Sequence, residues 1–148
     1  AMARISDDAS LAVGDTTDLG VRAKTSGPER SICFRHDTNN PASYTDDVWI
    51  CYFRNNSNVL WGCNKPTPLA NVPPQNIIMC NNGGTSNRLL ELDGSNNNFF
   101  NIVNNAASQL EYVELNLAGL YDPSLPMHVI ENPGYLLNTR INPAGCSR

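Results

Sequence analysis

The five cysteines are the residues of this 148-residue chain whose chemistry says most about it. Neighbouring cysteines are 18, 12, 17 and 66 residues apart, and no Cys-x-x-Cys pair occurs. A structural zinc site usually draws its ligands from close pairs, because one tight turn then aims two thiolates at one metal. The spacing therefore favours two disulfides and one remaining thiol in an oxidising compartment. The alternative is five reduced core cysteines in a cytosolic protein. The five are Cys33, Cys51, Cys63, Cys80 and Cys146.

Histidine chemistry is limited to His36 and His128, each with a carboxylate nearby. A Cys–His nucleophile would need Cys33 and His36, since a histidine must deprotonate the thiol. These positions face opposite sides of a strand, and no protease signature surrounds Cys33. The sequence has no Gly-x-Ser-x-Gly elbow, phosphate-binding glycine loop or dinucleotide fingerprint. We expect no catalytic residues, no cofactor and no enzyme activity.

Paired carboxylates could hydrolyse a glycosidic bond if two of them faced one another. Acidic residues are common at exposed strand positions, so a solvated sheet face is the simpler explanation of such pairs, and a small glycoside hydrolase is the weakest functional hypothesis. Residues 15–18 and 93–98 carry oxygen ligands that calcium prefers, but neither matches an EF-hand. Turn chemistry explains both, and no metal is expected. The carboxylate pairs are Asp46 with Asp47, Glu91 with Asp93, and Glu111 with Glu114.

The segments that must position these groups are short runs of apolar, aromatic and β-branched residues between Asn, Gly, Pro, Asp and Ser. Alternation is clearest where Val113, Leu115 and Leu117 share one face of a strand and Glu114 and Asn116 the other. About ten such strands predict an all-β single domain, an antiparallel β-sandwich or β-barrel with at most one short helix. The expected strands are 19–24, 31–34, 48–53, 59–63, 76–80, 88–92, 99–103, 110–117, 127–130 and 135–141.

A β-hairpin is predicted across the turn 54–58, because Asn tolerates positive φ and its side chain mimics backbone turns. With Arg54 opposite Leu60, Cys51 falls opposite Cys63, and we expect these two to form a disulfide. That bond requires a close, non-hydrogen-bonded pair. In another register, the disulfide partner of Cys51 or of Cys63 must be Cys33, Cys80 or Cys146.

The segment 98–110 has two interpretations. Phe99, Val103, Ala106 and Leu110 fit a helical stripe that Ser95 or Asn96 could cap. Asn, however, competes with the backbone for hydrogen bonds and is a mediocre helix former. We expect a strand followed by a turn, with a short helix as the alternative.

Composition excludes several classes of protein. Charged residues make up 16% of the chain, against roughly 25% in soluble domains, and the chain contains 21 asparagines. This mixture argues against a coiled coil or helical bundle. No apolar run approaches the roughly 18 residues of a membrane-spanning helix. The formal charge of −4 argues against a sequence-independent nucleic-acid binder, which relies on clustered cations.

Binding is the best-supported activity. Asn-rich loops on a rigid β scaffold offer neutral hydrogen-bonding groups, and aromatic side chains supply flat contact surfaces. For the tryptophans the alternative is a place in the core hairpin, because large aromatic side chains dominate core burial. The candidate binding residues are Trp49, Trp61, Tyr121, Tyr135, Asn96 and Asn97, with Tyr52 as a further aromatic.

Two features bear on the compartment. Asn55-Asn56-Ser57 is an N-glycosylation acceptor pattern in an expected surface turn, which makes Asn55 a candidate glycosylation site. The opening residues 1–3 have the character of a cloning remnant, which leaves 4–148 as a single secreted β domain.

In size, in Asn/Gly/Pro-rich β composition and in spaced cysteines, the chain resembles small secreted proteins of filamentous fungi and similar microbes, many of which act as effectors or elicitors on a host. The resemblance implies a non-enzymatic extracellular protein that works by binding a host protein or surface component. A lectin-like carbohydrate-binding protein is the second hypothesis.

Overall fold

The computed structural model describes residues 1–13, 20–27, 29–37, 48–65, 86–92, 98–107, 110–119 and 135–142. Within these residues the chain forms one helix and eight strands. No helix in this part of the chain is long and apolar enough to cross a membrane. The elements are α1 (Met2–Ser10), β1 (Val21–Lys24), β2 (Arg30–His36), β3 (Val48–Arg54), β4 (Val59–Lys65), β5 (Ser86–Glu91), β6 (Phe100–Asn104), β7 (Leu110–Gly119) and β8 (Tyr135–Ile141).

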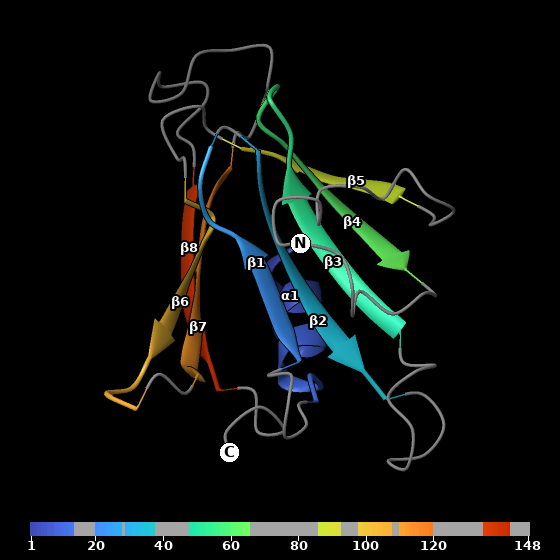
Figure 1. Cartoon of the computed structure of the whole chain (residues 1–148). Coiled ribbons are helices and arrows are strands. Elements are labelled where there is room, and N and C mark those ends of the chain that lie inside the picture. The colour runs from blue at the N-terminus through green and yellow to red at the C-terminus, as the bar shows by residue number, and fades with distance from the viewer. Residues whose placement is uncertain are drawn as a thin grey trace.

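The first five strands form an antiparallel sheet in which each strand pairs with the next one along the chain (Figure 1). Between β3 and β4 the chain turns through Asn55 to Asn58, and Asn58 has a φ of 60°, a left-handed conformation that asparagine tolerates. The β3–β4 register places Arg54 opposite Leu60, as the sequence predicted. This register fixes which side chains share each face of the sheet.

The last three strands form a second antiparallel sheet with β7 in the middle. The two sheets face one another, and a β-bridge between Leu92 and Gly119 joins them at one end (Figure 1). The all-β prediction is therefore confirmed, and of its two forms the described strands build the sandwich, because they form two separate sheets instead of one closed barrel.

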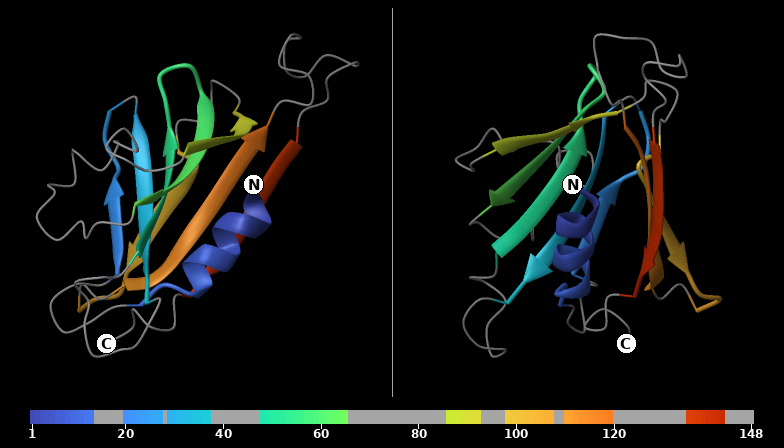
Figure 2. Two further views of the ribbon diagram at one scale, coloured as in Figure 1. Left: turned by 90° about the vertical axis from the view of Figure 1, so that its right-hand side faces the viewer. Right: turned by 180° about the vertical axis from the view of Figure 1, so that it is seen from behind.

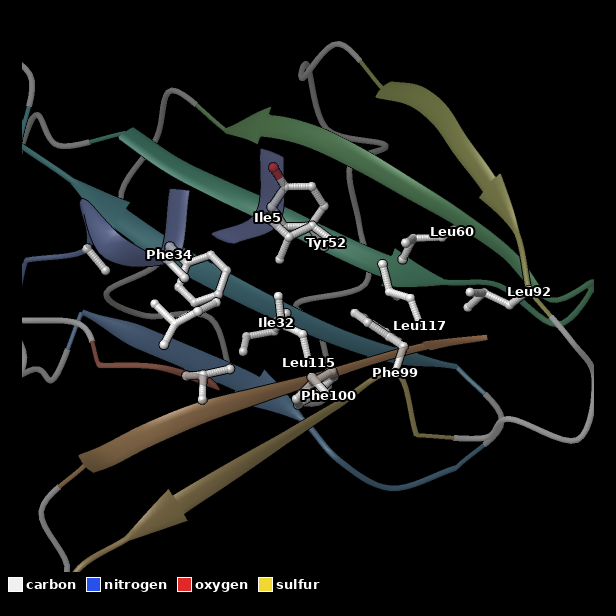
Figure 3. Close-up of a cluster of buried hydrophobic side chains, with 14 of the residues drawn as sticks. Ile5, Ile32, Phe34, Tyr52, Leu60, Leu92, Phe99, Phe100, Leu115 and Leu117 are labelled. Carbon is white, nitrogen blue, oxygen red and sulfur yellow. The ribbon is translucent and has the colours of Figure 1, made fainter. Parts of the chain in front are cut away.

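The main core fills the space between the sheets (Figure 3). Val113, Leu115 and Leu117 are fully buried there, which confirms the stripe predicted from alternation. Burying each such side chain stabilises the fold by roughly 1.5–3 kcal/mol. Other members of this core are Ile5, Ile32, Phe34, Tyr52, Leu60, Leu92, Phe99, Phe100, Leu110 and Ile141.

Helix α1 lies between the two sheets on the side where they splay apart (Figure 2). Ile5 and Ala9 are fully buried in the main core, Met2 packs partly against it, and α1 contacts β2, β7 and β8. The residues expected to be a cloning remnant thus include the first two residues of the helix, Met2 and Ala3. No helix was predicted here, although Met2, Ile5, Ala9 and Ala12 have the 3-4-3 spacing of an amphipathic helix.

The predicted strands are observed wherever the structure describes them, with ends that shift by up to two residues. The segment 98–110 is resolved in favour of a strand and a turn, because β6 ends at Asn104 and a turn follows before β7. The expected strands 76–80 and 127–130 lie outside the described residues.

Candidate functional site

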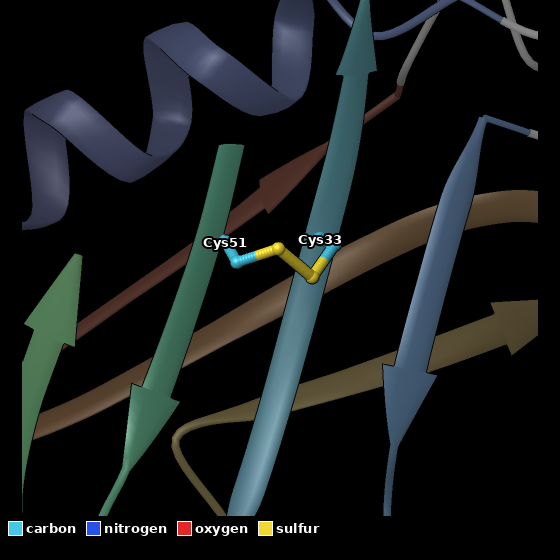
Figure 4. Close-up of a disulfide and its surroundings, with 2 residues drawn as sticks. All are labelled: Cys33 and Cys51. Carbon is cyan, nitrogen blue, oxygen red and sulfur yellow. A yellow bond between two sulfur atoms is a disulfide. The ribbon is translucent and has the colours of Figure 1, made fainter. Parts of the chain in front are cut away.

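Three cysteines stand in a row across β2, β3 and β4. The register places Cys33 opposite Cys51, and Cys51 opposite Cys63. The disulfide joins Cys33 to Cys51, whose Cα atoms are 4.0 Å apart (Figure 4). The predicted bond between Cys51 and Cys63 is therefore wrong, although the predicted register is correct.

The hydrogen-bond alternation of the sheet explains this choice. On an antiparallel middle strand, a residue whose backbone groups bond one neighbouring strand forms a close, non-hydrogen-bonded pair with the other. The N–H of Arg35 donates to the carbonyl of Gly20, on the β1 side of β2. Because backbone groups two residues apart on a strand point the same way, the backbone N–H and C=O of Cys33 also face β1. Its pair with Cys51 is then the close one that a disulfide needs.

The same alternation excludes the other pairing. The N–H of Asn55 donates to the carbonyl of Val59, so these two residues form a hydrogen-bonded pair. Every second pair of facing residues along β3 and β4, counted from this one, is then also hydrogen-bonded. Cys51 is four residues before Asn55, and Cys63 is four residues after Val59, so Cys51 and Cys63 also form a hydrogen-bonded pair. The Cα atoms of such a pair are further apart than those of a non-hydrogen-bonded pair. Cys63 forms a disulfide of its own, whose partner lies outside the described residues, as do Cys80 and Cys146.

The cysteine row belongs to a second buried cluster, on the face of the five-stranded sheet opposite the main core. Trp49 is part of this cluster and is 2% exposed. The guanidinium groups of Arg22 and Arg35 lie over its ring, 5.5 and 6.0 Å from the centroid. Trp49 was expected to contact a partner, and the structure instead gives its indole a packing role.

Trp61 lies on the same face as Trp49 but is only half-buried. Its ring stacks on that of Phe53, with centroids 6.4 Å apart and planes inclined by 13°. Its indole nitrogen is buried and has no hydrogen-bond partner. Trp61 is therefore only partly accessible to a partner.

Of the other predicted binding residues, the structure describes only the backbone of Tyr135. Tyr121, Asn96 and Asn97 lie outside the described residues. Tyr135 begins β8 in the other sheet, opposite Gly119, and the structure does not describe its side chain. Asn55 lies in the β3–β4 turn, which agrees with the expected location of the glycosylation pattern.

A polar cluster joins α1 to the five-stranded sheet. The hydroxyl of the buried Tyr52 donates to the carboxylate of Asp8, and a ring nitrogen of His36 lies 2.6 Å from the Asp8 carbonyl oxygen. Burial raises the pKa of Tyr52, and the Asp8 carboxylate raises it further. The phenol therefore stays protonated at neutral pH, and it and His36 both contact Asp8 of the helix.

Asp46, Asp47 and Asp93 lie outside the described residues, and most of the other candidate catalytic groups have different partners. Cys33 is in a disulfide. His36 is three residues further along β2, on the opposite face of the sheet, where it contacts Asp8, so the two form no nucleophile pair. Glu111 is exposed at the irregular start of β7, where the pairing with β6 shifts register, and Glu114 is ion-paired with Arg140. Glu91 is ion-paired with Arg88.

A set of ordered polar side chains covers the outer face of the three-stranded sheet. We call it the polar ladder, and it consists of Tyr112, Glu114, Asn116, Asn138 and Arg140. Glu114 stands opposite Arg140, and Asn116 stands opposite Asn138. The Arg140 Nε donates to Glu114 Oε1 over 3.3 Å, the Asn138 amide donates to that of Asn116, and the Arg140 guanidinium lies 5.0 Å from the Tyr112 ring centroid.

The polar ladder faces solvent and carries balanced charge. Arg140 and Asn138 are exposed, with the Arg140 side chain 64% accessible, while the other three members are half-buried. In the sequence, only the shared polar side of Glu114 and Asn116 on one strand could be predicted. The missing information was the β7–β8 pairing, which brings together residues 22 and 26 positions apart in the sequence.

Neither a metal site nor a known relative points to a function. Among the described residues, no three His, Cys, Asp or Glu side chains are grouped so that they could hold a metal ion. Comparison with protein-family models, curated proteins and solved structures finds no match to this chain.

Proposed function

We propose that the chain is a secreted, non-enzymatic binding protein, an effector or elicitor that acts on a host protein or surface component. The observation that carries this proposal is the polar ladder. Its side chains hold one another in place on the rigid strands β7 and β8. A partner that contacts such a surface pays little conformational entropy, because the recognising groups are already ordered.

The residue types of the polar ladder also fit recognition. Tyrosine and arginine are enriched among the residues that dominate binding energy at protein interfaces, and asparagine supplies adaptable hydrogen bonds. Here Arg140 lies over Tyr112, and the two amides of Asn116 and Asn138 are adjacent. The ion pair with Glu114 leaves the face without net charge, so selectivity would come from hydrogen bonding and shape.

The cysteine chemistry supports the proposed compartment. A Cys33–Cys51 disulfide and a second bond at Cys63 are stable in oxidising surroundings. Both cysteines of the first bond are almost completely buried, so the bridge belongs to the packed interior. This is the chemistry of a structural disulfide and fits an extracellular protein.

Carbohydrate recognition is the second candidate function, and the same face favours it. The amides of Asn116 and Asn138, together with the Tyr112 ring and the Glu114–Arg140 pair, offer donors and acceptors on one face of β7 and β8. Sugar hydroxyl groups need both kinds of group. The two candidate functions differ in ligand class and share the site.

The test compares three proteins on immobilised extracellular host proteins and on a glycan array: wild type, Tyr112→Ala/Arg140→Ala, and Arg88→Ala. Arg88 is a matched control, because it is also an exposed arginine in an ion pair, but on the other sheet. Circular dichroism and thermal denaturation first establish that all three are folded.

We expect saturable binding by wild type and by Arg88→Ala. Loss of a binding centre usually costs about 2 kcal/mol or more, so the double variant should bind at least about thirtyfold more weakly. Competition by a free sugar would assign the ligand to the carbohydrate class. Equal binding by all three proteins would refute the role of the polar ladder.

A further inference from the structure

We propose that Asn55 carries an N-linked glycan in the native protein. This inference rests on the proposed secretion of the chain. The sequence contains 21 asparagines, and only Asn55 begins an Asn-x-Ser/Thr pattern in which x is not proline. The structure adds the geometry of that pattern, which the sequence could not show.

The side chain of Asn55 has a fixed orientation. Its Oδ1 accepts hydrogen bonds from the backbone N–H of Ser57, over 3.0 Å, and from that of Val59, over 2.9 Å. The reversed amide would direct its own N–H groups at these two donors, so the orientation is determined by the hydrogen bonds. The Nδ2 atom, at which a glycan is attached, is therefore on the side away from the backbone donors.

The position of the turn leaves room for a bulky group. Asn56 and Ser57 are exposed, and the turn lies at the end of the β3–β4 hairpin (Figure 1). The base of the turn is held by a hydrogen bond from the Leu92 N–H to the Asn58 carbonyl. An oligosaccharide at this tip would extend into solvent from a well-supported loop.

Glycosylation preserves the contacts that form the turn. The Nδ2 atom of Asn55 bonds to C1 of the oligosaccharide and loses one proton, while the bond from C1 to the pyrophosphate of a lipid-linked donor breaks and the lipid pyrophosphate leaves. Oδ1 takes no part in the product bond. It can go on accepting from Ser57 and Val59, so the modified hairpin keeps its register.

To test this, the full chain is expressed behind a secretion leader in a eukaryotic host. Its intact mass is measured before and after treatment with peptide N-glycosidase. Ser57→Ala is the informative variant, because Ser57 contributes its backbone N–H to the turn and alanine retains that group. Ser57→Thr is the matched control that preserves the acceptor pattern. A known glycoprotein secreted from the same cells controls for transferase activity.

We expect one glycan on wild type and on Ser57→Thr, its removal by the glycosidase, and none on Ser57→Ala at an unchanged melting temperature. Secreted wild type that is disulfide-bonded but carries no glycan would overturn this inference and leave the proposed function standing. A chain whose cysteines all remain reduced in the medium would instead contradict the proposed compartment.

Discussion

Removing the Cys33–Cys51 disulfide should lower the free energy of unfolding by about 3 kcal/mol. The two cysteines are 18 residues apart. A cross-link over a loop of this length removes conformational entropy from the unfolded chain, and the loop-closure relation gives about 3 kcal/mol at room temperature. Both residues are almost fully buried, so Cys33→Ala/Cys51→Ala also removes packed sulfur atoms and adds a smaller loss.

Urea denaturation followed by circular dichroism measures the loss. With a slope of about 2 kcal/mol per molar urea, the midpoint of the double variant should fall by about 1.5 M. Repeating both titrations with reductant provides the control. Reduced wild type also lacks the Cys33–Cys51 loop constraint, so the difference between the two proteins should shrink to the packing contribution alone.

Equal midpoints for the oxidised proteins would refute the entropic reasoning. Peptide mapping under non-reducing conditions provides an independent check. A linked fragment that contains Cys51 and Cys63 would show that the close pair lies on the other side of β3, contrary to the hydrogen-bond alternation.

Three further predictions concern the core, a glycine contact and the α1 cluster. Leu115→Ala, at a fully buried position, should cost about 2–5 kcal/mol in urea titrations, and a cost below that of a surface substitution would contradict its placement. Gly62→Ala places a methyl group 3.1 Å from both Tyr52 Cε1 and Leu89 Cδ1 and should cost about 1–3 kcal/mol; an unchanged melting temperature would argue against this contact. The pKa of Tyr52 in the folded state is raised above its ordinary value of 10.0, mainly by burial and further by Asp8. The stability that Tyr52 contributes is therefore complete below pH 10.0 and is lost as the pH rises through the folded-state pKa. Tyr52→Phe should therefore be less stable at neutral pH but lose less further stability in alkaline thermal scans, and identical pH profiles would exclude this role.

Local sequence patterns predicted all eight described strands. Alternation along Val113, Leu115 and Leu117 gave the buried side of β7, and the Asn-rich turn after Arg54 gave the β3–β4 register. Both signals are short-range, since a strand repeats every two residues and a tight turn sets the pairing of its own hairpin. Long-range pairings have no equivalent signal.

The errors arose where a long-range contact decided the outcome. Cys33 and Cys51 meet through the β2–β3 pairing, and only the hydrogen-bond phase of the whole sheet shows that this pair is the close one. Helix α1 was missed because its apolar stripe is short and includes the small Ala9, whose burial depends on the sheets.

The candidate site was predictable only in part. The polar character of Glu114 and Asn116 could be seen in the sequence, but Arg140 and Asn138 reach them through the β7–β8 register. Trp49 was expected at a binding surface because aromatic side chains serve both cores and interfaces. Its burial beside the cysteine row depends on tertiary packing that composition does not encode.

The proposal of a secreted binding protein depends most directly on the redox state of the five cysteines. Intact-mass measurement after alkylation, under denaturing and non-reducing conditions, counts the free thiols of the protein isolated from its native source. One bond joins Cys33 to Cys51 and a second involves Cys63, so four of the five cysteines are used and one label is expected. Five labels would place the protein in a reducing compartment and contradict the account.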